Sequence, residues 1–302
     1  MASGEHRPDP AVDEPVGAPS SRTLGRNLPV AVASGGALAV LFAGTLLLAD
    51  MAFLTFVAVV LVLGLLELDA AFRTRGLRPA TPVVLGTGLL MLYGAYAGAA
   101  PGAMAGTFPS GEAAQALGLV LLLIGAVAWA AIDPVRERSG GSLGATCLMA
   151  LWVPFQASFL GLLLAREQGE LLVSAVVALA VTTDIAAFGF GSMLGRHRLA
   201  PIVSPSKTWE GLGGGLLTTI VVAAGATAPL LEALNALQAV ALGATVALAA
   251  TLGDLTESLV KRDLGFKDLG RIIPGHGGIM DRVDGLLFAL PAAHLLLVAL
   301  GL

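Results

Sequence analysis

Long apolar runs, separated by short polar segments, dominate the chain from residue 29 onward. The first run, from Pro29 to Leu66, contains a single charged residue, Asp50. One helix over these 38 residues would be about 57 Å long, almost twice the ~30 Å hydrocarbon core of a bilayer. The run therefore predicts two membrane spans that turn near Asp50.

Further apolar runs are each long enough to cross a bilayer, which takes roughly 20 residues. They lie at about 79–100, 113–132, 143–164, 170–193, 211–231, 235–258 and 283–302. We therefore expect an all-α, polytopic integral membrane protein with about nine transmembrane helices. The composition agrees with this expectation, since 56% of the residues are hydrophobic, 13% are charged and the mean hydropathy is +0.85.

The basic residues predict how these spans are oriented. If the N-terminus is cytoplasmic, 16 of the 17 Lys and Arg residues fall in the N-terminal tail or in cytoplasmic loops, and Arg166 is the exception. Basic residues are enriched in cytoplasmic loops, so this distribution favours nine spans with the C-terminus outside. The expected location is the cell membrane.

Five acids stand out because charged groups are costly inside a membrane. Asp184 lies in the middle of an apolar run, and it is either functional or paired with a polar neighbour. Asp254 and Glu257 are three residues apart at the inner end of one span, which places them on one helical face. Asp281 and Asp284 repeat this spacing at the start of the next span. Two such pairs favour a Mg²⁺ site, although the acids would also neutralise nearby Lys and Arg.

Two polar segments complete the candidate chemistry. Residues 204–211 read Ser-Pro-Ser-Lys-Thr-Trp-Glu-Gly, and hydroxyls, a lysine and free N–H groups at a helix start are typical of an anion site. The alternative is an ordinary turn that caps the next helix, with Glu210 as the capping acid. His276-Gly277-Gly278 predicts a tight loop where backbone approaches a ligand. With one cysteine, Cys147, and no second histidine near His276, a zinc site is not expected.

Together these features suit a metal-bound polyphosphate that reacts with a membrane-borne substrate at the cytoplasmic face. A transporter with Asp184 as its coupling site is an alternative from another class. A transporter should spread intramembrane charge near the midplane of several spans, whereas most charge here lies at the inner ends of the final spans.

The segment from Ser258 to Asp284 resembles the signature of the phosphatidate cytidylyltransferases, also called CDP-diacylglycerol synthases. The matching positions are Ser258, Lys261, Arg262, Lys267, Asp268, Gly270, Ile273, Pro274, His276, Gly277, Gly278, Asp281, Arg282 and Asp284. Residues 184–188 and 204–211 are similar to the same family, with Phe188 where many members have tyrosine. The resemblance covers about residues 180–302, and the first half is similar only in being hydrophobic and multi-spanning.

The resemblance implies a nucleotidyltransferase of phospholipid biosynthesis. Such enzymes join CTP and phosphatidate to give CDP-diacylglycerol and pyrophosphate, with the lipid phosphate attacking the α-phosphorus and pyrophosphate leaving in line. The implied cofactor is Mg²⁺, with the possibility of a second cation. The family suggests a homodimer, and no nucleic-acid partner is expected.

The same resemblance implies roles for individual residues. The expected catalytic residues are Asp281, Asp254, Lys261 and Arg282. The expected metal ligands are Asp281, Asp254, Asp284 and Asp184. The expected substrate-binding residues, which include the basic groups for the phosphates, are Ser204, Ser206, Lys207, Thr208, Arg262, Lys267, His276, Gly277 and Gly278.

These interpretations divide the chain into three regions. Residues 1–28 are a disordered polar cytoplasmic tail, and residues 29–169 hold about five N-terminal spans. Residues 170–302 are a C-terminal catalytic membrane region with cytoplasmic loops at 195–210 and 259–282.

A CDP-alcohol phosphotransferase is the alternative enzyme, because it also uses Mg²⁺ and closely spaced aspartates at a membrane interface. Its characteristic Asp-Gly-x-x-Ala-Arg opening is absent, since Asp284-Gly285 is followed by Leu-Leu-Phe.

Overall fold

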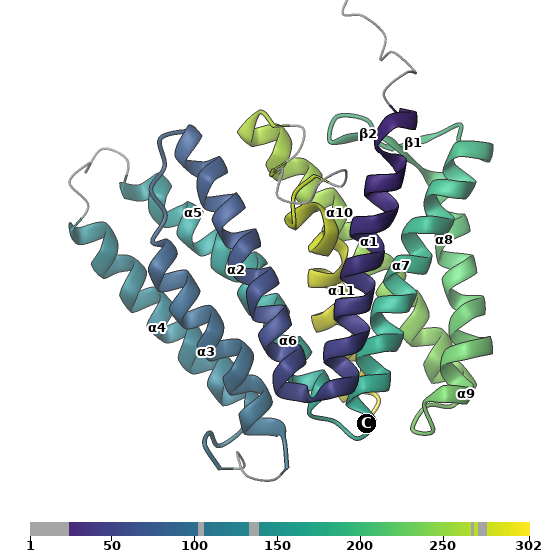
Figure 1. The fold of residues 1–302 in the computed structure, drawn as a ribbon, viewed down its shortest axis with the longest axis horizontal. Coiled ribbons are helices and arrows are strands. Elements are labelled where there is room, and N and C mark those ends of the chain that lie inside the picture. The colour runs from purple at the N-terminus through teal and green to yellow at the C-terminus, as the bar shows by residue number, and fades with distance from the viewer. Residues whose placement is uncertain (1–23, 102–105, 133–138, 267–268, 271–276) are drawn as a thin grey trace, which may run out of the picture.

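The computed structural model describes residues 24–101, 106–132, 139–266, 269–270 and 277–302. Over these residues the chain is a bundle of helices with one small two-stranded hairpin (Figure 1). Inside a bilayer the backbone N–H and C=O groups have no water to bind, so apolar runs fold as helices that satisfy these groups internally. Of the expected tail, residues 1–23 lie outside the described part, and the first helix begins at Leu24.

The N-terminal half contains α1 to α6. Their bounds are α1 Leu24–Leu48, α2 Asp50–Thr74, α3 Thr81–Ala99, α4 Gly111–Ile132, α5 Ser139–Trp152 and α6 Pro154–Leu164. The predicted turn near Asp50 is confirmed, because α1 ends and α2 begins on either side of Ala49. Helices α5 and α6 form one apolar segment that is interrupted at Val153, because the following Pro154 has no N–H with which to continue the helical hydrogen bonds.

The C-terminal half contains α7 to α11. Their bounds, with the short π-helical turn η2, are α7 Gly169–Leu194, β1 Arg198–Ala200, β2 Ser204–Thr208, α8 Trp209–Val222, η2 Ala223–Thr227, α9 Ala228–Leu230, α10 Ala236–Leu264 and α11 Met280–Ala299. The antiparallel hairpin of β1 and β2 lies within the 195–210 segment. It is a small exception to the all-α prediction, and it pairs the backbone groups of a segment that lies between two spans.

Eight helical segments of the described chain are long and apolar enough to cross a membrane. They correspond to eight of the nine expected runs, from Asp50–Thr74 to Met280–Ala299. The remaining run lies in α1, whose apolar part among the described residues, Ala33–Leu48, is shorter than a full span. The chain is therefore a multi-pass membrane protein.

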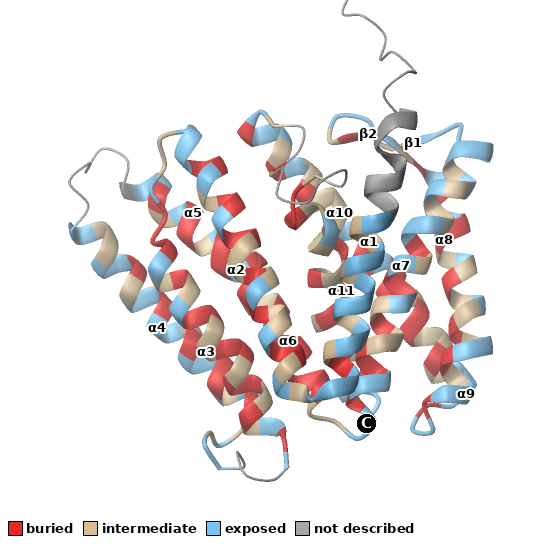
Figure 2. Cartoon of the chain, viewed as in Figure 1, coloured by how far each residue is buried: buried red, intermediate tan, exposed pale blue. Residues whose placement is uncertain are grey.

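The outer surface of the bundle is apolar, as a bilayer requires. Large hydrophobic side chains face outward on several helices, including Leu47 on α1, Ile124 on α4 and Met193 on α7, which are 79%, 61% and 83% exposed (Figure 2). Large contiguous apolar patches are an aggregation liability in a soluble protein, but in a bilayer they contact lipid hydrocarbon. The buried residues line the helix contacts in the middle of the bundle.

The arrangement of the helices brings the polar segments to one end. In Figure 1, α10 and α11 lie between the α3–α6 group and the α7–α9 group. The C-terminal end of α2, the β1–β2 hairpin, the C-terminal end of α10 and the N-terminal end of α11 share one end of the bundle. Among the described residues, these segments carry Arg73, Arg198, Lys207, Lys261, Arg262 and Arg282 of the expected cytoplasmic loops, whereas Arg166 follows α6 near the opposite end. Which side of the membrane this end faces stays a prediction.

Helices α10 and α11 approach each other very closely at Gly253. A Cβ atom at that position would lie 2.3 Å from the carbonyl oxygen of Asp284 and 2.9 Å from the Cα atom of Gly285. Small residues allow membrane helices to pack with their backbones in near contact. This contact lies one residue from Asp254, so it sets the spacing between acids on the two helices.

Candidate active site

A cavity of about 710 Å³ opens between α7, α8, α10, α11 and the β1–β2 hairpin. Ten of the residues predicted for the site line it: Asp184, Ser204, Ser206, Lys207, Thr208, Asp254, Lys261, Asp281, Arg282 and Asp284. The hairpin and four helices thus bring together segments that are up to about 100 residues apart in the sequence. The cavity has the size of a small-molecule site.

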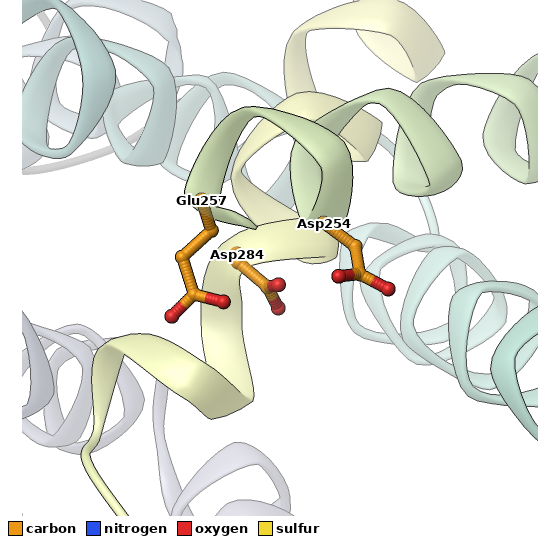
Figure 3. A group of neighbouring side chains, drawn as sticks. All are labelled: Asp254, Glu257 and Asp284. Carbon is orange, nitrogen blue, oxygen red and sulfur yellow. The ribbon is translucent and has the colours of Figure 1, made fainter. Parts of the chain in front are cut away.

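Three carboxylates form a compact group on one side of this cavity. Asp254 and Glu257 come from α10 and Asp284 comes from α11, and one oxygen of each lies within 4.8 Å of the others. Figure 3 shows the three side chains pointing into the same space. Glu257 is 2% exposed. Hard cations such as Mg²⁺ and Ca²⁺ are bound by sets of oxygen ligands of this kind, so the group has the chemistry of a metal site.

Glu257 is the member of this group that the expected ligand set omits. The signal for it was present in the sequence, since its spacing of three residues from Asp254 places both on one face of α10. Asp284 and Asp254 belong both to the group and to the predicted ligands. Asp184 lies on α7 and lines the same cavity outside the group, so its role as a ligand stays a prediction.

Asp281 makes different contacts from the three grouped acids. Its Oδ1 atom accepts a hydrogen bond from Lys261 Nζ at 2.8 Å, and its Oδ2 atom accepts one from the Gly278 N–H at 2.8 Å. Lys261 Nζ also donates to Glu257 Oε2 at 2.7 Å. The ammonium group of Lys261 therefore joins α10 to the first turn of α11. The predicted role of Asp281 as a metal ligand is untested by these contacts.

The β1–β2 hairpin contributes the opposite wall. Arg198 pairs with Thr208 and Ala200 with Ser204 in its antiparallel register. The Lys207 ammonium group forms an ion pair with Asp254 across the cavity, which connects the hairpin to the acidic group.

The end of the hairpin also begins helix α8. The Thr208 hydroxyl accepts a hydrogen bond from the Gly211 N–H at 3.1 Å, so this residue is the N-cap of α8. Glu210 instead contacts His197, whose Nδ1 lies 2.6 Å from Glu210 Oε1. Helix capping and substrate contact are compatible here, because Ser204, Ser206 and Thr208 also line the cavity.

Charges of both signs meet in the cavity. Among the described residues its lining has five acids, namely Asp184, Asp254, Glu257, Asp281 and Asp284, and four bases, namely Arg198, Lys207, Lys261 and Arg282. Carboxylates suit cations, while lysine and arginine suit phosphate oxygens. The arrangement can therefore hold a polyphosphate together with its counter-cation.

The other predicted residues lie beside the cavity or outside the described chain. Arg262 is exposed on α10, with its Nε atom 3.4 Å from the Val203 carbonyl oxygen. Gly277, at a φ of 85°, and Gly278 lie directly before Ile279, the N-cap of α11. Lys267 and His276 fall outside the described residues. Substrate binding by these residues stays a prediction.

Comparison with known proteins extends the similarity to nearly the whole chain. The model of the cytidylyltransferase family matches residues 30–300. A phosphatidate cytidylyltransferase of Mycobacterium bovis is 32% identical over 289 residues, which cover 91% of this chain and 90% of the relative. The protein of that name from Mycobacterium leprae is 34% identical over 286 residues, covering 87% and 85%. That of Staphylococcus aureus is 45% identical over a shorter stretch of 122 residues, 38% of this chain and 45% of the relative. The N-terminal half therefore shares more with these proteins than its hydrophobicity.

Proposed function

This chain belongs to the cytidylyltransferase family, and we propose on that basis that it is a phosphatidate cytidylyltransferase (CDP-diacylglycerol synthase) of phospholipid synthesis. The observation that carries this function is homology to enzymes of that name over about nine-tenths of both chains. The cavity supports it, because its acids and bases suit a nucleoside triphosphate with its cation.

The reaction joins CTP to phosphatidate. An oxygen of the lipid phosphate forms a bond to the α-phosphorus of CTP, the bond from that phosphorus to the oxygen bridging to the β-phosphate breaks, and pyrophosphate leaves. The attacking oxygen is already anionic, so the protein has no need of a strong general base. Catalysis then consists of positioning the two phosphates and neutralising their charge.

The residues that would hold Mg²⁺ are Asp254, Glu257 and Asp284. Their convergence from two helices, within 4.8 Å of one another, fits a hard cation. When bound, Mg²⁺ would neutralise phosphate oxygens and stabilise the charge that develops on the leaving group. Asp281 and Asp184 are proposed as additional ligands, because both line the same cavity.

The basic side chains would bind the phosphate groups of both substrates. Lys207 and Lys261 contact carboxylates of the site, so each ammonium group lies where a cation-bound phosphate would be placed. Arg282 lines the same cavity and can bind a phosphate through two parallel N–H groups. Ser204 and Ser206 on the hairpin would donate hydroxyl hydrogen bonds from the opposite wall. Arg262, Lys267, His276, Gly277 and Gly278 remain proposed contacts.

The lipid tails of phosphatidate would remain in the bilayer. Phe188 on α7 and Leu212 on α8 line the cavity, and Phe188 is 79% exposed. Apolar side chains at the cavity rim allow acyl chains to lie against α7 and α8 while the phosphate reaches the acids. We propose that this end of the bundle is cytoplasmic, as the basic residues favour. A homodimer is proposed from the family resemblance alone.

The test uses purified protein in detergent with CTP labelled on its α-phosphate, phosphatidate and Mg²⁺. We expect a labelled lipid that carries CMP, release of pyrophosphate, and loss of both products when Mg²⁺ is chelated. A parallel reaction supplies CDP-diacylglycerol and a lipid alcohol acceptor in place of CTP. Labelled lipid from CTP supports the proposal, whereas no such lipid with any divalent cation, or consumption of CDP-diacylglycerol instead, contradicts it.

A further inference from the structure

A buried acid on α2 binds the start of α11. Glu67 is 5% exposed, and its Oε2 atom accepts hydrogen bonds from the N–H groups of Ile279 at 2.7 Å and Met280 at 3.2 Å. The first N–H groups of a helix have no intrahelical partner and carry partial positive charge. A carboxylate accepts hydrogen bonds from these N–H groups and its negative charge is attracted to the helix start. Glu67 does both here, although it lies 212 residues before Ile279 in the sequence.

Three glycines leave room for this carboxylate and for the start of α11. A Cβ atom on Gly270 would lie 2.1 Å from Glu67 Oε1, and the three heavy atoms nearest to it would all belong to Glu67. A Cβ atom on Gly278 would lie 2.8 Å from Glu67 Oε2 and 3.0 Å from Asp281 Oδ2. Gly64, one helical turn before Glu67, would meet Met280 Sδ at 3.0 Å. The face of α2 that carries Glu67 therefore packs closely against the N-terminal end of α11.

The same helix α2 also binds the end of α10. Arg75 Nε, just beyond α2, donates a hydrogen bond to the Leu264 carbonyl oxygen at 2.9 Å. Leu264 is the final residue of α10, where unpaired carbonyl groups carry partial negative charge. An arginine thus meets the C-terminus of α10 and a glutamate meets the N-terminus of α11. Both ends of the connection between the two acid-bearing helices are therefore held, one by Glu67 of α2 and the other by Arg75 at the C-cap of α2.

The contacts of Glu67 and Arg75 with α11 and α10 affect where the three carboxylates of the acidic group lie relative to one another. Asp284 is four residues beyond Met280, which is about 6 Å along the axis of α11. A shift or rotation at the start of α11 therefore moves the Asp284 carboxylate relative to Asp254 and Glu257. The Gly253 contact sets the distance between α10 and α11, and Lys261 holds Asp281 only through a flexible side chain, so the bonds from Glu67 are what fix the backbone at the start of α11.

Resting on the function proposed above, we propose that Glu67 is a positioning residue of the active site. Its carboxylate holds the N-terminus of α11 so that Asp284 meets Asp254 and Glu257 at the spacing that binds the cation. The N-terminal half thereby supplies part of the geometry of a site whose lining comes from residues 184–284. A purely structural anchor would lower stability without changing the affinity of the site for Mg²⁺.

The experiment compares Glu67→Ala and Glu67→Gln with a matched control, Ser158→Ala. Ser158 accepts a hydrogen bond from Gln115 at 2.8 Å in the buried interior of the same half, far along the chain from the acids. Two quantities are measured in detergent: kcat with CTP and phosphatidate, and the Mg²⁺ concentration that gives half of the maximal rise in melting temperature without substrates. The second reports binding at the site independently of turnover.

We expect Glu67→Ala to lower kcat at least tenfold and to raise the half-saturating Mg²⁺ concentration at least fivefold. Glu67→Gln keeps one carbonyl oxygen for the two N–H groups, so it should retain most of both properties. Ser158→Ala should lower the melting temperature and leave kcat and the Mg²⁺ response unchanged. Equal Mg²⁺ responses in Glu67→Ala and Ser158→Ala would overturn the proposal.

Gly270→Ala gives a second route if Glu67→Ala fails to fold. The added methyl group would collide with Glu67, so Gly270→Ala alone should weaken the Mg²⁺ response. In a protein that already carries Glu67→Ala, the same substitution should have little further effect. Fully additive effects would contradict the assigned contact. If the wild-type protein makes no labelled lipid but shows the expected Mg²⁺ responses, the proposed reaction fails while the positioning role stands.

Discussion

Replacing Gly253 with alanine tests whether the close contact of α10 and α11 determines activity. The added Cβ atom would lie 2.3 Å from the Asp284 carbonyl oxygen, whereas carbon and oxygen atoms in contact are about 3.3 Å apart at their closest. The two helices must therefore separate by about 1 Å beside the acidic group. Overpacking of this size costs typically 1–3 kcal/mol of folding free energy.

The effect on catalysis should be larger than the effect on stability. A displacement of about 1 Å in a catalytic arrangement can lower the rate by about 10²-fold. We therefore expect Gly253→Ala to reduce kcat by about 10- to 100-fold in the CTP assay, with a modest fall in the melting temperature. The carboxylates themselves are unchanged in this variant, so the loss would come from their spacing alone.

Gly213→Ala on α8 is the matched control. A Cβ atom there would meet nothing within 4 Å, so the substitution adds a methyl group without a collision. Alanine favours helix over glycine by roughly 0.5–1 kcal/mol, and this variant should be as stable as wild type or slightly more so. If Gly253→Ala turns over CTP as fast as Gly213→Ala, the reasoning from helix spacing is wrong.

Three further predictions concern single residues around the cavity. Glu257→Gln should raise the Mg²⁺ concentration needed for half-maximal activity at least tenfold, because an amide is a weaker ligand for a hard cation than a carboxylate. An unchanged Mg²⁺ titration would contradict this. Asp281→Asn should abolish turnover while the protein stays folded and inserted, since Lys261 loses an anionic partner across the two helices. Near-wild-type turnover of CTP in detergent would count against that role. Thr208→Val should lower the unfolding free energy by about 1 kcal/mol, because α8 loses its N-cap hydrogen bond. Thermal denaturation measures this, with Thr182→Val as the control, since the Thr182 hydroxyl donates to the Ala178 carbonyl oxygen of its own helix.

The membrane spans could be predicted because the physical constraint on them is local. An apolar run of sufficient length forms a helix in lipid wherever it occurs, and the runs from Asp50 onward match helices of the structure. The ends were less predictable: α10 continues to Leu264, beyond the expected limit at 258, so Lys261 and Arg262 are helical. Basic residues are stabilised in the final turns of a helix, which helps to explain this extension.

The members of the acidic group depended on information that local patterns lack. The spacing of Asp254 and Glu257 showed that they share a face, but the rotation of α11 about its axis decides whether Asp281 or Asp284 joins them. That rotation follows from contacts distant in sequence, at Gly253, Lys261 and Glu67. Glu67 directly follows the apolar run that ends at Leu66, and no nearby residue in the sequence indicates its bond to Ile279.

The bond from Glu67 to the start of α11 also has a consequence for the order of events during synthesis. Ile279 is the 212th residue that the ribosome adds after Glu67, so α2 enters the membrane long before its partner is made. The nucleotide site therefore cannot form helix by helix as the protein is inserted. It forms only when α11 joins the bundle. A chain whose translation stops before α11 would therefore be inserted in the bilayer but inactive.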